Sequence, residues 1–103
     1  MDNATRKRFR QIAHHLNPVV SIGDGGVSEA VIAETNRALD DHELIKVKIH
    51  SEDRDDRAVL CAELAEACQA ESIQRIGKVL VLYRANPEAK AELSNIARTP
   101  KSR

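Results

Sequence analysis

The chain has 103 residues, in which 16 Lys and Arg balance 16 Asp and Glu to give a formal net charge of zero. This length allows one domain with one hydrophobic core. No apolar run reaches the roughly 18 residues of a membrane span. The charged start Arg6-Lys7-Arg8 is unlike the apolar core of a signal peptide, so we expect a cytoplasmic protein.

The first predicted element is a helix with Thr5 as its N-cap. Its apolar residues recur at i, i+3, i+4 and i+7, the spacing of a core-facing stripe: Phe9, Ile12, Ala13 and Leu16. A second stripe beside it is basic and contains no acid. This basic stripe comprises Arg6, Lys7, Arg10 and His14. Asn17-Pro18 ends the helix.

A β-branched strand, Pro18 to Ile22, then leads into the loop Gly23-Asp24-Gly25-Gly26 and a helix from Val27 to Leu39. Ser28 is the predicted cap of this helix. A GxxG loop lets a sugar-phosphate backbone approach closely, and a helix start offers N–H groups to it. The same loop also serves simply to turn the chain. Ser28 stands where a dinucleotide fingerprint needs glycine, and the ending of a Walker A loop is absent.

The rest of the chain predicts a strand, a helix and a hairpin. Leu44 to His50 alternates apolar residues with Lys46, Lys48 and His50, which indicates a strand with a basic outer face. Ser51 to Asp56 leads into a third helix. Its predicted buried stripe is Leu60, Cys61, Leu64, Ala67 and Cys68. Strands 72–76 and 79–84 flank Gly77-Lys78, which suits a type II′ turn.

The predicted order is α-β-α-β-α-β-β, an α/β fold in which helices pack on one four-stranded mixed sheet. Residues 1–84 form the domain, and residues 85–103 form a tail. In the tail, Asn86-Pro87 opens a short helix that reaches about Ala97, and Arg98 to Arg103 is expected to be disordered.

No motif predicts catalysis or a cofactor. Cys61 and Cys68 lie seven residues apart on one helix, about 10 Å along its axis, which is beyond the reach of a disulfide. The four histidines lack the spacing of metal ligands. No nucleophile–base pair or paired carboxylates stand out. We therefore expect a non-enzymatic chain without metal, cofactor or small-molecule substrate.

The balanced charge is segregated along the chain. Residues 1–16 hold four Lys or Arg against one acid, and residues 72–84 hold three against none. Residues 51–71 hold seven acids against two arginines. A polyanion responds to the local potential more than to the total charge, so a neutral chain of this kind is able to bind nucleic acid on a basic face.

Four stretches together resemble the CRM domain (chloroplast RNA splicing and ribosome maturation) in its stand-alone bacterial YhbY-type form. They are residues 13–20 (AHHLNPVV), 22–27 (IGDGGV), 42–49 (HELIKVKI) and 76–84 (IGKVLVLYR). This resemblance implies a fold similar to the C-terminal domain of translation initiation factor three. It also implies RNA binding through the GxxG loop, and association with precursors of the large ribosomal subunit.

The predicted RNA-binding residues combine the loop with the basic positions around it. They are Gly23, Asp24, Gly25, Gly26, Arg6, Lys7, Arg10, His14, Lys46, Lys48, Lys78 and Arg84. Asp24 departs from the basic or neutral residue that family loops often carry. Its carboxylate would repel a phosphate by about 1 kcal/mol at a solvated distance of 4 Å. Either Asp24 points away, or the loop contributes less, or the carboxylate accepts hydrogen bonds from RNA.

Aromatic residues are scarce, so recognition is expected to depend on backbone and shape more than on base stacking. Phe9 is predicted to lie in the core, and Tyr83 is left open. We expect a monomer whose partner is RNA, and the resemblance implies that this RNA is ribosomal. The alternative is a protein-interaction module that docks a basic protein on the acidic residues near Asp53, Asp55 and Asp56.

Overall fold

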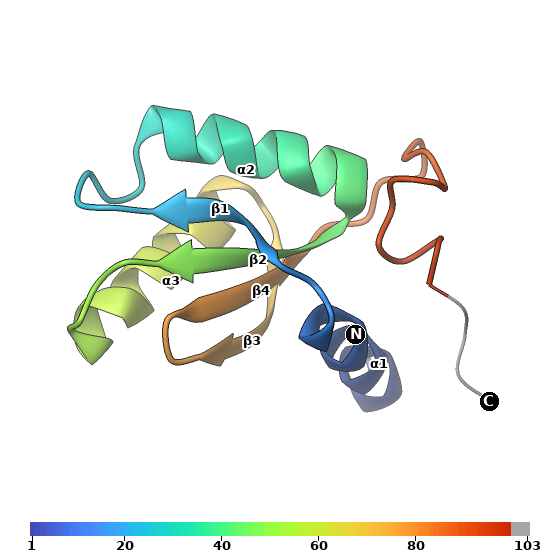
Figure 1. Cartoon of the computed structure of the whole chain (residues 1–103), viewed down its shortest axis with the longest axis horizontal. Helices are drawn as coiled ribbons and strands as arrows, with labels where there is room; N and C mark the ends of the chain where they lie inside the picture. The colour runs from blue at the N-terminus through green and yellow to red at the C-terminus, as the bar shows by residue number, and fades with distance from the viewer. Residues whose placement is uncertain (100–103) are drawn as a thin grey trace.

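The computed structural model describes residues 1–99, and over this range it has the predicted order of elements (Figure 1). The helices are α1 (Asn3–His14), α2 (Glu29–His42) and α3 (Arg54–Ala67). The strands are β1 (Pro18–Ile22), β2 (Leu44–Ile49), β3 (Glu71–Ile76) and β4 (Val79–Tyr83). The α/β fold expected from the sequence is confirmed.

The four strands form one mixed sheet in the order β1-β2-β4-β3. Strands β1 and β2 are parallel, which requires a crossover, and α2 supplies it. Strand β4 runs antiparallel to both β2 and β3. Strands β2 and β4 are therefore central, which explains the continuous apolar sequence of β4, whereas β1 and β3 are edge strands.

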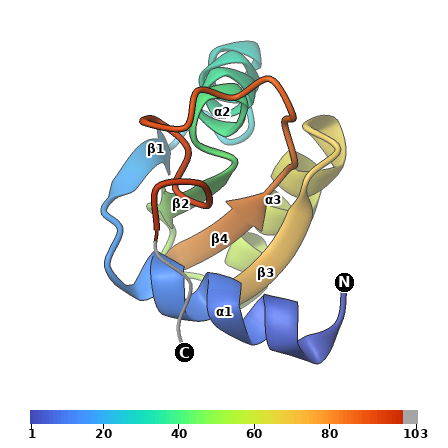
Figure 2. The same ribbon diagram turned by 90° about the vertical axis from the view of Figure 1, so that its right-hand side faces the viewer.

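The sheet is covered on two faces by different helices (Figure 2). Helices α2 and α3 pack on one face, where Leu39 and Leu64 meet Val47 and Leu80 in the larger core. Helix α1 packs on the other face, in a smaller core around Phe9. The contacts of this smaller core fall on the first residues of β2 and β3 and the later part of β4. Helix α1 therefore covers one end of its face and leaves the other end open.

The three helices begin on polar caps. Asp2, and not Thr5, caps α1: the Asp2 carboxylate accepts the Thr5 N–H at 2.7 Å, because the helix begins three residues earlier than the sequence suggested. Ser28 caps α2 as predicted, and its hydroxyl accepts the Val31 N–H at 3.2 Å. Asp53 caps α3. In the β3–β4 turn, Gly77 has a φ of 55° and Lys78 is not among the residues with positive φ, as a type II′ turn requires.

Residues 85–99 differ from the prediction. They form a series of turns, and no α-helix lies between Asn86 and Ala97. Ser94 and Asn95 are buried, and the Asn95 amide donates to the Leu44 carbonyl at 2.7 Å. Such side-chain bonds to the backbone compete with helix formation. Arg98 and Thr99 also have defined partners on Asn95, contrary to the expected disorder, and residues 100–103 lie outside the described residues.

The predicted core positions are confirmed with one exception. Ala67 is exposed, and Ala65 packs against the core instead. Cys61 and Cys68 are buried free thiols, and burial raises the pKa of both. Phe9 is buried as expected, and its ring centroid lies 4.6 Å from that of half-buried Tyr83. Desolvation is also the main cause of the raised pKa of Tyr83.

Candidate nucleic-acid interface

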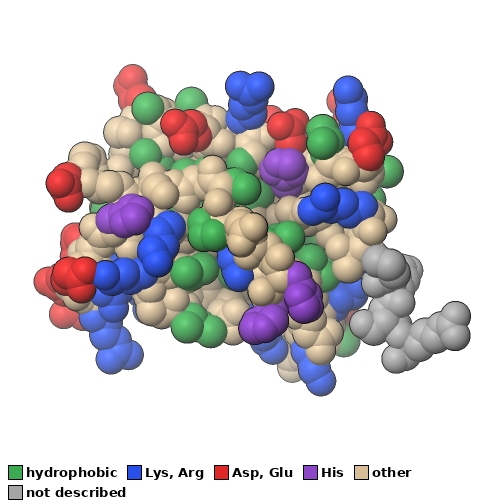
Figure 3. Space-filling model, in the orientation of Figure 1, with side chains coloured by type: hydrophobic (Ala, Val, Ile, Leu, Met, Phe, Trp, Pro, Cys, Tyr) green, Lys and Arg blue, Asp and Glu red, His purple; other side chains and the backbone are tan. Residues whose placement is uncertain are grey.

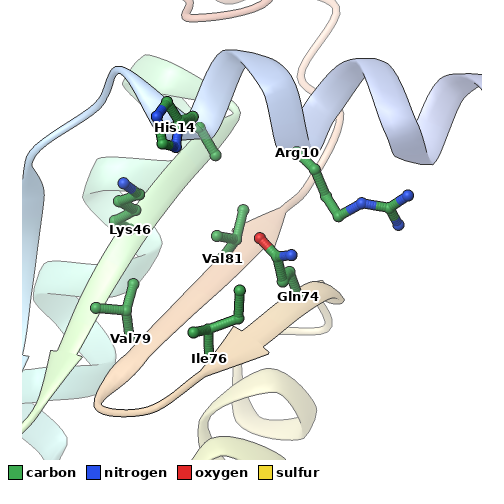
Figure 4. A pocket seen from close by; sticks show the side chains of 8 residues that line it. Arg10, His14, Lys46, Gln74, Ile76, Val79 and Val81 are labelled. Atoms are coloured by element: carbon green, nitrogen blue, oxygen red, sulfur yellow. The ribbon is translucent and has the colours of Figure 1, made fainter.

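A hollow of about 200 Å³ lies where α1 leaves the sheet face open (Figure 4). Its floor comes from β3 and β4, and includes Ile76, Val79 and Val81. Arg10 and His14 of α1 stand on one side, and Lys46 of β2 on another. In the antiparallel pairing of β2 with β4, Lys46 lies opposite Val81. This pairing places the lysine directly beside the apolar floor.

The hollow continues into a more open depression of about 490 Å³, since Arg10, His14, Gln74 and Ile76 line both. We call the two together the α1 groove. Three further polar residues line it: Lys7 and Gln11 of α1, and His15 at the C-cap of this helix. Among residues 1–99, no carboxylate lines the groove. Its local potential is therefore positive, although the chain as a whole is neutral.

The cations of the groove are unpaired. Within residues 1–99 the ion pairs are Arg6–Glu71, Lys78–Glu52 and Arg84–Asp40, and none involves Lys7, Arg10 or Lys46. Lys48 lies two residues beyond Lys46 on the same face of β2, opposite Val79 of β4. It also lacks an ion pair in the described chain. These side chains are free to meet a ligand.

The groove also holds an apolar and an amide side chain of the kind that contacts a nucleobase. Ile76 is 63% exposed, an unusual exposure for a large apolar side chain on a sheet. The Gln74 side chain lies beside it and has no hydrogen-bond partner among residues 1–99, so both its donor and its acceptor are available.

Three predicted binding residues are occupied elsewhere. The Arg6 guanidinium donates to Glu71 at 2.8 Å and to the Ser72 carbonyl at 3.0 Å, which ties α1 to the start of β3. Lys78 pairs with Glu52. Arg84 donates to Asn36 and Asp40 of α2 and to the Cys68 carbonyl, at distances of 2.7 to 2.9 Å. The structure therefore divides the predicted basic set into free and engaged members.

The glycine loop lies at the opposite end of the sheet from α1. Gly23, Asp24 and Gly25 are exposed, so other atoms do not bury the loop. A Cβ at Gly23 or Gly25 would meet no atom within 4 Å, whereas Gly26 has a φ of 67° that side chains rarely adopt. Gly26 is therefore required for the turn itself.

The surroundings of the loop are acidic. The hollow at the loop is lined by Asp24, Glu52 and Asp56, with His50 as its one basic residue. Helix α2 behind the loop starts with Glu29, and Ser28 already accepts one of its first N–H groups. Red side chains gather at the left end of the molecule and along the top over α2, with some blue ones among them, while the side chains along the middle and bottom are blue and purple without red away from the left end (Figure 3).

Sequence reasoning missed Gln11, His15, Gln74 and Ile76 of the groove lining. Gln74 and Ile76 alternate along β3 and so share a face, a signal that was present in the sequence. Their position next to α1 depends on the strand order, which no local pattern in the sequence indicates.

Within residues 1–99, no group of three or more His, Cys, Asp or Glu converges as a metal site would require. The helices of this range are too short or too polar to cross a bilayer.

Known proteins are similar to this chain in sequence and in fold. Residues 1–84 match the family model of the CRS1 / YhbY (CRM) domain. The "Probable RNA-binding protein PA4753" of Pseudomonas aeruginosa is 47% identical over 93 residues, which cover 90% of this chain and 89% of that protein. An "RNA-binding protein" of Haemophilus influenzae is 45% identical over 89 residues, covering 85% of this chain and 90% of its own.

A solved structure agrees with the sequence matches. The solution structure of the "hypothetical protein SAV1595" from Staphylococcus aureus superimposes with a TM-score of 0.76 at 34% identity, and covers 87% of this chain and 94% of its own. Fold and sequence thus converge on one assignment: the chain belongs to the CRS1/YhbY (CRM) domain family.

Proposed function

We propose that this protein is a non-enzymatic RNA-binding domain whose main contact surface is the α1 groove. The observation that carries the proposal is the set of unpaired cations, Lys7, Arg10 and Lys46, around a groove without carboxylates. Relatives at 45% and 47% identity are named as RNA-binding proteins, which supports RNA as the ligand class.

The groove combines two kinds of contact. Its cations stand on the rim and would neutralise backbone phosphates, which supplies most of the affinity of such interfaces. Its floor is apolar, with Ile76 largely exposed and the Gln74 amide free. An unpaired base would find an apolar surface and a polar edge there, so single-stranded or looped RNA fits better than a regular duplex.

In this proposal the glycine loop has a secondary role. Gly23, Asp24 and Gly25 leave the main chain accessible, but Asp24, Glu52 and Asp56 oppose a phosphate. Lys48 lies between the groove and this end of the sheet and extends the basic surface toward the loop. The loop would therefore guide a strand that the groove holds.

The resemblance of the chain to YhbY-type proteins suggests ribosomal RNA in precursors of the large subunit as the target, with the protein acting as a monomer in the cytoplasm. Sequencing the RNA that cross-links to the protein in cells tests the target. Enrichment of large-subunit rRNA is expected, and cross-links spread over messenger RNA would contradict it.

The contact surface is tested by binding to protein-free single-stranded RNA over a range of salt concentrations. Arg10→Gln and Lys46→Gln should each reduce the slope of log K against log salt by about 0.7. The matched control is Arg37→Gln, which removes the same charge from an exposed position on α2. Unchanged slopes for both groove variants would refute the groove, and binding only to a basic protein would favour the protein-interaction alternative.

A further inference from the structure

A second hollow is surrounded by arginines. It has a volume of about 110 Å³ and is lined by Arg54 and Arg57 of α3, Arg75 of β3 and Gly77 of the β3–β4 turn. We call it the arginine hollow. Arg75 stands opposite Leu80, a residue of the core beneath α2 and α3, so it lies on the sheet face opposite the α1 groove.

The acidic residues nearby form no ion pair with these arginines within residues 1–99. Asp53 accepts the N–H groups of Asp55 and Asp56, and Asp56 accepts the Ser51 hydroxyl. Glu52 pairs with Lys78. No carboxylate lines the hollow, and no ion pair within residues 1–99 includes any of the three arginines.

Two of the arginines lie near the start of α3, whose first turn also holds Asp55 and Asp56. Arg54 and Arg57 occupy the first turn of α3, where the helix dipole disfavours cations. Arg57 is held in place by a bond of 2.9 Å from its guanidinium to the Ser51 carbonyl. Burial raises the pKa of the Cys61 thiol, but Arg75 and Arg57 both act to lower it, which is consistent with their lying close together. Like charges converge here without an ion pair to any acidic side chain of residues 1–99.

We propose that the arginine hollow binds a phosphate group, and that a phosphodiester of the RNA held in the α1 groove supplies it. Guanidinium groups match the geometry of phosphate oxygens, and Gly77 leaves the turn without a side chain. The choice of RNA as the source rests on the proposed function, whereas the phosphate chemistry of the hollow does not.

The topology connects the two sites. Strand β3 is an edge strand, so no further strand of the described part of the chain covers its outer side. Ile76 lines the α1 groove and the preceding residue, Arg75, lines the arginine hollow, because successive side chains of a strand point to opposite faces. An RNA strand that leaves the groove over Ile76 reaches Arg75 by wrapping around this edge.

The test uses oligouridylate as the RNA and inorganic phosphate as the free anion. The double variant Arg54→Gln/Arg75→Gln retains Arg57, whose bond to Ser51 supports the local fold. It should lower the salt slope of oligouridylate binding by about 1.4, the loss of two single-strand contacts. The control Arg37→Gln/Lys90→Gln removes the same charge from two exposed positions and should leave the slope unchanged.

Phosphate titrations followed by NMR of the arginine side chains distinguish the sources. A lowered slope confirms an RNA phosphate. An unchanged slope, with saturable shifts of Arg54, Arg57 and Arg75 that the double variant abolishes, keeps the phosphate site and rejects RNA as its source. If neither a lowered slope nor saturable shifts are observed, the proposal is overturned. Arg10→Gln/Lys46→Gln measured in parallel reports on the α1 groove separately, so the failure of one site is not mistaken for failure of the other.

Discussion

The two ends of the sheet differ in what their charges do. At the α1 end, Arg10 and Lys46 line a hollow with an apolar floor and have no ion pair within residues 1–99. At the loop end, Asp24 and Glu52 flank glycines whose backbone is exposed. The α1 end thus offers charge, and the loop end offers access to the main chain.

This difference teaches that the number of cations does not define a binding surface. What matters is whether each cation already has a partner within the fold. Arg6 and Arg84 are arginines like Arg10, but their guanidinium groups are engaged in contacts within the fold. The engaged cations stabilise the domain, and the free ones remain for a polyanion. Variants that reverse or remove one class of cation test this division.

Reversing two free charges should have the largest effect. Arg10→Glu/Lys46→Glu removes two charge-assisted contacts of about 1.5 kcal/mol each, which corresponds to roughly a hundredfold loss of RNA affinity. Fluorescence anisotropy with labelled single-stranded RNA measures the loss, and circular dichroism checks the fold. Arg37→Glu/Lys90→Glu is the matched reversal away from the groove. An equal loss in that control would show that only total charge matters.

Removing an engaged cation should affect stability instead. Arg84→Met leaves Asn36 and the Cys68 carbonyl without their partner, and should lower the free energy of unfolding by about 2 kcal/mol. Urea denaturation measures this change. RNA affinity of the folded variant should stay within twofold of the parent, and a large loss of affinity with intact stability would return Arg84 to the binding surface.

Two glycines of the loop should also differ in how much they contribute to stability. Gly26→Ala forces a side chain into a φ of 67° and should cost about 1 kcal/mol of stability. Gly25→Ala is the control, because its Cβ meets open space and its φ is not positive. Equal urea midpoints for the two variants would show that the turn tolerates a side chain at Gly26.

Neutralising the acidic loop should strengthen binding slightly. Asp24→Asn removes a repulsion of about 1 kcal/mol or less, so RNA affinity should rise up to about fivefold at low salt and less at high salt. Affinity that does not respond to this change at any salt concentration would place the RNA away from the loop.

The smallest effect concerns the caps of the two helices. The Thr5 N–H lowers the pKa of the Asp2 carboxyl below its usual 3.8, so the stabilisation of α1 is present above that value and is lost as the pH falls through the lowered pKa. Asp2→Asn should remove this pH dependence, as seen in thermal melts between about pH 2 and pH 6. Ser28 of α2 does not titrate, so Ser28→Ala should leave the dependence in place.

Local patterns in the sequence were sufficient for most of the fold. Alternation identified the basic face of β2, the glycine of a type II′ turn marked the hairpin, and Ser28 was recognised as a cap. These features depend on residues adjacent in the chain. The predictions for Thr5 and for a helix at 86–97 were wrong, because contacts from Asp2 and from the Glu43–Leu44 corner decided those segments.

The sequence by itself determined the elements, their order, the family and the existence of basic segments. The tertiary structure alone decided which cations are free. The partners of Arg6 and Arg84 lie 16 to 67 residues away along the chain, and no periodicity reports such distances. Strand order brought Gln74 and Ile76 to Arg10 and Lys46, because β4 inserts between β2 and β3 and places α1 across all three.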